Sequence, residues 1–197
     1  MCYIIGRTFF LLVFKLFFRF RAYGRENIPE NGGFIIASNH ESNLDPILIG
    51  AASPRSINFM AKAELFRNKF FGFILSKVNA FAVKRSKLDL GSLREALFRL
   101  KNKQGLLLFP QGQRRDELVM DEVKEGIGFL SSRAGVPIIP AFIKGSGAAL
   151  GKGRSWPKLA AISVYFAEPI IPKSPKDYSG IAKEAVSSIK KLSDVYK

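Results

Sequence analysis

The sequence predicts an α/β domain, and two patterns in it support that prediction. Short apolar runs rich in β-branched and aromatic residues alternate with longer segments of helical periodicity, as in sheets covered by helices. The short runs are almost continuously apolar, which is expected for strands buried on both faces. At 197 residues, 47% of them hydrophobic, the chain is long enough to bury a sizeable core within one domain.

The predicted strands and helices alternate along most of the chain. Strands are predicted at residues 34–38, 57–61, 80–83, 106–109, 137–143 and 161–166. Helices are predicted at residues 46–52, 88–102, 124–134 and 179–196. Gly135 stands where a left-handed residue closes the third of these helices. Asn31, Gly32 and Gly33 mark a turn before the first strand, and a loop rich in small residues is expected over 145–157.

The first 22 residues have a different character from the rest. Residues 3–21 are mostly aromatic and aliphatic, but they include the cations Arg7, Lys15, Arg19 and Arg21. These charges argue against a transmembrane helix, because a spanning segment needs about 20 largely uncharged apolar residues. An amphipathic helix in the membrane interface fits better, with its cations at the headgroups; the alternative is a buried core helix. We therefore expect an interfacial helix over 1–22, followed by the α/β domain over 23–197.

The charge of the chain predicts an anionic partner. Lys and Arg total 31 against 16 acidic residues, a formal net charge of +15, which fits nucleic acid or an anionic membrane with phosphorylated substrates. A second basic and aromatic segment, over 66–77, either extends the membrane-facing surface or forms a core helix with solvated lysines. The single cysteine and single histidine exclude an intramolecular disulfide and metal sites built from cysteines or several histidines.

His40 and Asp45 follow the first predicted strand and form the first candidate site. Histidine is the side chain that most readily exchanges a proton near neutral pH, and a carboxylate on one ring nitrogen fixes its tautomer. The spacing lets Asp45 turn back to His40, although an Asp before Pro46 is also a good helix N-cap. Ser38 and Ser42 lack the Gly-x-Ser-x-Gly setting of a nucleophile, so the base would activate a hydroxyl of the substrate.

Two further polar clusters follow the third and fourth predicted strands. Lys84 and Arg85 make up the first, and Gln111, Gly112, Gln113 and Arg114 the second. Glycine lets a ligand approach the backbone closely, and arginine suits bidentate binding of phosphate. The alternative is that these are solvated loop charges. Because the loops at strand ends commonly assemble sites in α/β folds, we expect the clusters to converge.

Taken together, these clusters resemble the motif blocks of the glycerolipid acyltransferase family, whose best-known members acylate 1-acylglycerol-3-phosphate. The first block, Asn-His-x-x-x-x-Asp, is matched by Asn39, His40 and Asp45. The second, third and fourth blocks are similar to residues 81–85, 109–114 and 136–140, and residues 60–66 look like the segment between the first two. One His-x-x-x-x-Asp is a weak signal, but four ordered blocks over about residues 24–171 are a strong one.

The resemblance implies a mixed sheet wrapped by helices, with an amphipathic N-terminal element in one leaflet. It implies acyl transfer from acyl-CoA or acyl carrier protein to the sn-2 hydroxyl of lysophosphatidic acid, giving phosphatidic acid. His40 then acts as the base and Asp45 orients it, and no metal or bound cofactor is needed. The acceptor is expected to contact residues of the two polar clusters and one further lysine, namely Lys62, Lys84, Arg85, Gln111, Gly112, Gln113 and Arg114, with an oxyanion donor near Gly112.

The expected partners are an anionic membrane surface, the lysolipid and the thioester carrier, but no nucleic acid. The expected location is the cell membrane, with the protein peripheral or monotopic on the cytoplasmic face. Gln111 departs from the family pattern, which usually has Glu there, and Gln113 stands where Thr is common. This departure bears on the acceptor and not on the reaction, and the alternative acceptor is another lysophospholipid or a lyso-aminolipid. The remote alternative is a non-enzymatic basic protein that binds membrane or nucleic acid.

Overall fold

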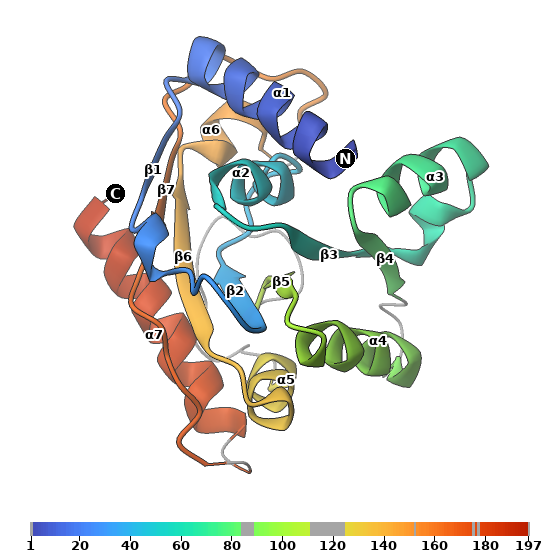
Figure 1. Cartoon of the computed structure of the whole chain (residues 1–197). Coiled ribbons are helices and arrows are strands. Elements are labelled where there is room, and N and C mark those ends of the chain that lie inside the picture. The colour runs from blue at the N-terminus through green and yellow to red at the C-terminus, as the bar shows by residue number, and fades with distance from the viewer. Residues whose placement is uncertain are drawn as a thin grey trace.

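The computed structural model describes residues 2–83, 89–110, 125–151, 153–174, 176 and 178–196. Within them the chain forms three layers, a sheet with helices on both faces (Figure 1). The helices are α1 (Cys2–Phe18), α2 (Asp45–Ala52), α3 (Lys69–Lys77), α4 (Leu90–Lys101), α5 (Gly126–Ala134), α6 (Ser146–Leu150) and α7 (Tyr178–Tyr196). The strands are β1 (Arg21–Tyr23), β2 (Phe34–Ser38), β3 (Ile57–Lys62), β4 (Ala80–Val83), β5 (Gly105–Leu108), β6 (Ile138–Lys144) and β7 (Ser163–Phe166).

The described strands form one seven-stranded sheet in the order β1-β7-β6-β2-β5-β3-β4. All neighbouring strands in this sheet are parallel except β6 and β7, which run antiparallel. The predicted mixed α/β sheet is therefore confirmed. Strand β2 lies at the centre between β5 and β6. Because β2, β5 and β3 run in the same direction, the residues that follow them emerge at one edge of the sheet.

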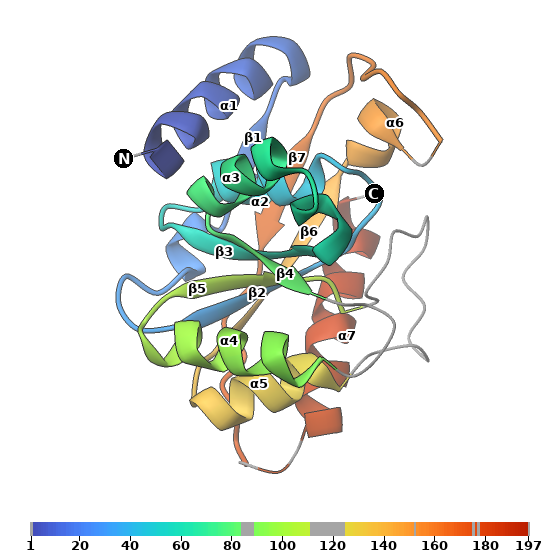
Figure 2. The same cartoon turned by 90° about the vertical axis from the view of Figure 1, so that its right-hand side faces the viewer.

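Apolar clusters fill the space between the sheet and each helical layer. Successive side chains of a strand point to opposite faces, so Phe34 and Ile36 of β2 enter one cluster and Ile35 and Ala37 the other. The first cluster includes residues of α1, α2 and α6, and the second includes residues of α4, α5 and α7. Figure 2 shows α1 and α2 on one side of the sheet and α4 and α5 on the other. Burial on both faces explains the nearly continuous apolar runs of the strands.

Helix α1 ends earlier than the sequence predicts, and the chain joins the sheet at once. The helix stops at Phe18, Arg19 adopts a positive φ of 47°, and Phe20 is buried. Residues 21–23 then form β1, which pairs in parallel with β7. The predicted boundary between the interfacial helix and the α/β domain, after residue 22, therefore falls inside β1. The reason is that Phe20 is buried in the core, which brings the residues after it into the sheet.

One stripe of α1 is buried and another is exposed, so α1 is not a core helix buried on all sides. Phe14 and Phe18 enter the first apolar cluster, and the Tyr3 hydroxyl accepts a hydrogen bond from the Ile57 amide at 3.2 Å. Burial raises the pKa of the Tyr3 phenol above its ordinary value. The exposed stripe contains Leu12 and Leu16, which are 62% and 75% exposed. No helix in the described parts of the chain is long and apolar enough to cross a membrane.

Several other element boundaries differ from the prediction. The strand predicted over 161–166 begins at Ser163, and the predicted loop over 145–157 contains α6. The predicted helix starts at residues 88 and 124 lie outside the described residues. Gly135 has a φ of 67° and closes α5, as predicted.

Helix α3 resolves the two interpretations of segment 66–77. The Asn68 side chain accepts hydrogen bonds from the amides of Phe70 and Phe71, which caps the start of the helix. No residue of α3 is buried, and Phe70, Phe71 and Phe73 are all exposed. The prediction of a core helix is therefore wrong for this segment.

Candidate active site

The His40 and Asp45 side chains meet directly after the central strand. Nδ1 of His40 lies 2.9 Å from Oδ2 of Asp45, and the two side chains are 11% and 0% exposed. With the carboxylate as the acceptor, Nδ1 carries the proton and Nε2 keeps its lone pair. The geometry therefore supplies an oriented imidazole with one basic nitrogen.

The Asp45 carboxylate is held by the loop that precedes it. Its Oδ2 accepts hydrogen bonds from the amides of Glu41 and Ser42 at 2.7 and 2.8 Å, in addition to the contact with His40. Asp45 is the first residue of α2, whose positive end favours a negative charge there. The helix has no side-chain cap. Asp45 thus turns back toward the histidine, and the N-cap interpretation of this residue is wrong.

Asn39 links the loop after β2, which carries His40 and is called the histidine loop below, to the neighbouring strand β6. Its Oδ1 accepts a hydrogen bond from the Ile143 amide at 2.8 Å, and its Nδ2 donates to the Ile143 carbonyl at 3.0 Å. Nδ2 also donates to Oε1 of Glu41 at 2.9 Å. Asn39 is 3% exposed, so these bonds replace water for a buried amide. They tie the residue before His40 to β6 and to the side chain of the residue after it.

Phe109 covers one face of the histidine ring. Its ring centroid lies 3.9 Å from that of His40, and the two planes are inclined by 14°. Phe109 directly follows β5, which pairs with β2, so the sheet brings the first and third motif blocks together. The sequence interpretation missed this contact and the bridge made by Asn39. Both residues lie in the motif blocks, but only the pairing of the strands shows what they touch.

Of the other predicted site residues, the structure describes only Lys62. Lys62 is exposed at the end of β3, at the same edge of the sheet as His40. The remaining predicted residues lie outside the described part of the chain; they are Lys84, Arg85, Gln111, Gly112, Gln113 and Arg114. The structure therefore brings His40 and Asp45 together, and the roles of these two residues and of Lys62 stay predictions.

A polar cavity of about 540 Å³ lies away from this pair, near the amino ends of β3 and β5. Its arginines already have partners. Arg55 donates to backbone carbonyls of neighbouring turns, and Arg99 donates to the side chains of Glu95 and Asn58. Because these groups hold the fold, the candidate active site is the His40 edge of the sheet.

Comparisons with known proteins show the family of this chain. A family model described as Acyltransferase matches residues 19–144, which include His40, Asp45 and Phe109. A 1-acyl-sn-glycerol-3-phosphate acyltransferase from Bacillus subtilis (strain 168) is 32% identical over 151 residues, which are 76% of this chain and 73% of that protein. This chain belongs to the acyltransferase family.

Other relatives of this acyltransferase carry the same description. One from Streptococcus pneumoniae is 29% identical over 62% of this chain, and the matched part is 46% of that longer protein. The crystal structure of the 1-acyl-sn-glycerophosphate (LPA) acyltransferase PlsC from Thermotoga maritima is similar with a TM-score of 0.78. The sequences are 26% identical, and the match covers 96% of this chain and 80% of that one. The likeness thus includes nearly all of this acyltransferase.

The arrangement in this acyltransferase suits proton transfer to and from a substrate. A histidine whose Nδ1 is bound to a buried carboxylate can accept a proton at Nε2, and the carboxylate stabilises the imidazolium that forms. No group of three or more histidine, cysteine, aspartate or glutamate side chains within metal-binding reach occurs among the described residues.

Proposed function

We propose that this protein transfers a fatty acyl group from an acyl thioester to the sn-2 hydroxyl of 1-acylglycerol-3-phosphate, which forms phosphatidic acid. The observation that carries the proposal is the 2.9 Å contact between His40 Nδ1 and Asp45 Oδ2, which leaves Nε2 to act as a base. The descriptions of the relatives from Bacillus subtilis and Thermotoga maritima support this acceptor.

In the proposed reaction the acyl group passes directly from donor to acceptor. Nε2 of His40 takes the proton of the acceptor hydroxyl as its oxygen attacks the thioester carbonyl. Asp45 stabilises the imidazolium formed in this step. Collapse of the tetrahedral intermediate breaks the carbon–sulfur bond, and the imidazolium returns its proton to the departing thiolate. The base is thereby regenerated, and the products are an ester and a free thiol.

The donor and the binding groups are part of the same proposal. The donor is acyl-CoA or acyl carrier protein, and the reaction uses no metal and no bound cofactor. Lys62, exposed at the end of β3, provides a cation for the acceptor phosphate. Lys84, Arg85 and Arg114 are proposed to complete this binding, with Gln111, Gly112 and Gln113 near the reacting groups.

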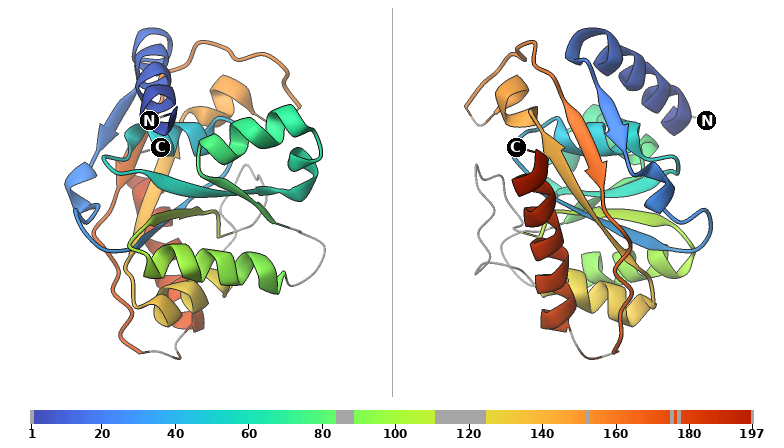
Figure 3. Two further views of the ribbon diagram at one scale, coloured as in Figure 1. Left: turned by 45° about the vertical axis from the view of Figure 1, so that its right-hand side comes forward. Right: turned by 90° about the vertical axis from the view of Figure 1, so that its left-hand side faces the viewer.

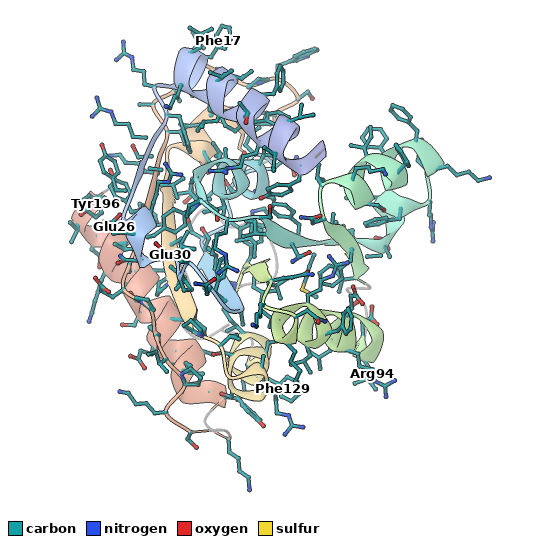
Figure 4. The ribbon with its side chains drawn as sticks, viewed as in Figure 1. Phe17, Glu26, Glu30, Arg94, Phe129 and Tyr196 are labelled. Carbon is teal, nitrogen blue, oxygen red and sulfur yellow. The ribbon has the colours of Figure 1, made fainter. Side chains whose placement is uncertain are left out.

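The protein is proposed to work at the cytoplasmic face of the cell membrane without spanning it. The exposed stripe of α1 and the exposed aromatic residues of α3 give it apolar surface suited to the acyl region of a bilayer. Phe17 projects outward from α1 in Figure 4. Basic residues accompany both helices, including Lys15 on α1 and Lys69 on α3, and they suit anionic headgroups.

An acceptor panel tests the proposed function. Purified protein is given an acyl thioester and, in separate reactions, lysophosphatidic acid, glycerol 3-phosphate, lysophosphatidylcholine or monoacylglycerol. We expect lysophosphatidic acid to be the best acceptor by kcat/KM, because it alone in this panel combines a phosphomonoester with an acyl chain. Glycerol 3-phosphate lacks the chain, lysophosphatidylcholine carries a phosphodiester of lower charge, and monoacylglycerol carries no phosphate. Equal use of monoacylglycerol would contradict the phosphate-binding role. If the enzyme prefers another lysolipid, the proposed acyl transfer stands but the proposed acceptor is wrong. That outcome is the alternative suggested by Gln111.

A further inference from the structure

The loop between α6 and β7 presents two large apolar side chains to solvent. Trp156 is 84% exposed and Leu159 is 77% exposed. We propose that this loop is a further membrane contact, with Trp156 at the headgroup boundary and Leu159 beside it. This inference rests on the membrane association proposed above and extends it to a loop far along the sequence from α1 and α3.

The exposed position of Trp156 belongs to a loop that is fastened on both sides. Before it, Nη1 of Arg154 donates to the Ala148 carbonyl at 2.7 Å. After it, the Lys158 amide donates to the Ala149 carbonyl at 2.8 Å. Both acceptors belong to α6. Hydrogen bonds on both sides of Trp156 thus hold the loop against α6, while the indole of Trp156 stays exposed to solvent and does not pack in the core.

This loop adjoins the end of α1, the helix proposed to lie in the interface. The Ile162 amide donates to the Phe18 carbonyl at 3.0 Å, and the Arg21 amide donates to the Ile162 carbonyl at 3.1 Å. Leu159 lies only three residues before Ile162. Figures 1 and 3 show the loop at the same end of the molecule as α1, with α3 on that side of the sheet as well. The three segments can therefore meet one surface together.

The chemistry of the loop favours an anionic bilayer as the occupant. Tryptophan is enriched at membrane interfaces because its ring is apolar at one end and carries a hydrogen-bond donor at the other. Arg154 and Lys158 flank Trp156, and Arg19 and Arg21 are exposed at the neighbouring end of α1. In an anionic bilayer the cations would meet the lipid headgroups, and the apolar side chains at the tip of the loop would enter the acyl region beneath them. The alternative is that a protein partner covers this loop. Vesicles that contain lipid and no other protein distinguish the two, because only a lipid-binding loop contacts them.

Trp156 is the only tryptophan in the sequence, so its fluorescence reports on this loop without a label. The whole protein is mixed with vesicles of phosphatidylglycerol and phosphatidylcholine, and binding is measured in parallel by sedimentation. We expect the emission to shift to shorter wavelength on binding and to be quenched by brominated phosphatidylcholine. Binding without a shift or quenching would overturn this inference and leave the membrane association by α1 intact. Absence of binding would overturn both proposals.

A matched pair of variants gives a second measurement. Leu159→Ser removes an apolar side chain from the loop, and Ile171→Ser removes one that is 69% exposed on the segment between β7 and α7. Losing the burial of one large apolar side chain corresponds to about a tenfold weaker vesicle affinity, so we expect that loss for L159S and unchanged affinity for I171S. Equal affinities of the two variants would contradict the loop's contact with lipid.

Discussion

The imidazole of His40 lies parallel to the ring of Phe109, with the ring centroids 3.9 Å apart. The same imidazole is bound through Nδ1 to Asp45. Phe109 therefore contacts the face of the imidazole, and Asp45 binds its Nδ1. Nε2 is the ring nitrogen that remains to exchange a proton with the substrate. The two supports come from different parts of the chain, since Phe109 follows β5 and Asp45 begins α2.

Replacing Phe109 with Leu should lower kcat while the protein stays folded. Stacked aromatic pairs contribute about 0.5–1.5 kcal/mol beyond their buried area, which corresponds to a loss of roughly threefold to tenfold in rate if that energy orients the base. Because His40 is the only histidine, its ring protons are identifiable by NMR. They should lose the ring-current shift from Phe109 in the F109L variant. Unchanged ring-proton shifts would contradict the stacking.

Asp45→Asn should nearly abolish acyl transfer with a small effect on stability. The amide oxygen of Asn can still accept hydrogen bonds from the Glu41 and Ser42 amides, but it cannot stabilise an imidazolium as a carboxylate does. By analogy with other carboxylate–histidine pairs, we expect a loss of about 10³–10⁴-fold in kcat. Asp45→Ala leaves both amides without this acceptor and should also lower Tm. Near wild-type kcat for D45N would refute the role of the carboxylate.

Asn39→Ala should destabilise the protein and reduce activity, because it removes the bridge between the histidine loop and Ile143. Leaving buried backbone groups unpaired costs about 1–3 kcal/mol. Asn43→Ala is the matched control, since Asn43 lies in the same loop but is exposed. Chemical unfolding measures both variants. Equal stability of N39A and N43A would show that the bridge contributes nothing.

The exposed stripe of α1 should govern vesicle binding. The double variant Leu12→Ser and Leu16→Ser removes two apolar side chains that project from the fold, so we expect about a hundredfold or greater weakening by the usual values of about 1.5–3 kcal/mol per fully buried side chain. Ile171→Ser with Val195→Ser is the control, because both side chains are exposed at sites outside α1. Sedimentation with anionic vesicles compares the two. Similar binding would remove α1 from the proposed interface.

Much of the fold could be predicted because burial on both faces leaves a direct mark on the sequence. The apolar runs at β2 and β6 were recognisable for that reason. Strand β1 was not, since its three residues include an exposed arginine and become a strand only through pairing with β7. Helix α6 was missed as well, because its short, glycine-containing sequence has the composition of a loop.

The site was predictable only where the contacts are local in sequence. Only four residues lie between His40 and Asp45, so a turn of the chain is enough to bring them together. The stack of His40 on Phe109 depends on β5 lying beside β2, and the Asn39 bridge depends on β6 lying on the other side. Such pairings between distant strands have no signal in a single sequence.

The central claim is that Nε2 of His40 is the base in acyl transfer. We would measure transfer from acyl-CoA and from acyl carrier protein to lysophosphatidic acid, for wild type and for His40→Ala, with vesicle binding and Tm measured on the same preparations. We predict that H40A binds vesicles and unfolds as the wild type does, but forms no phosphatidic acid with either donor. Substantial phosphatidic acid formation by folded, vesicle-bound H40A would contradict the claim.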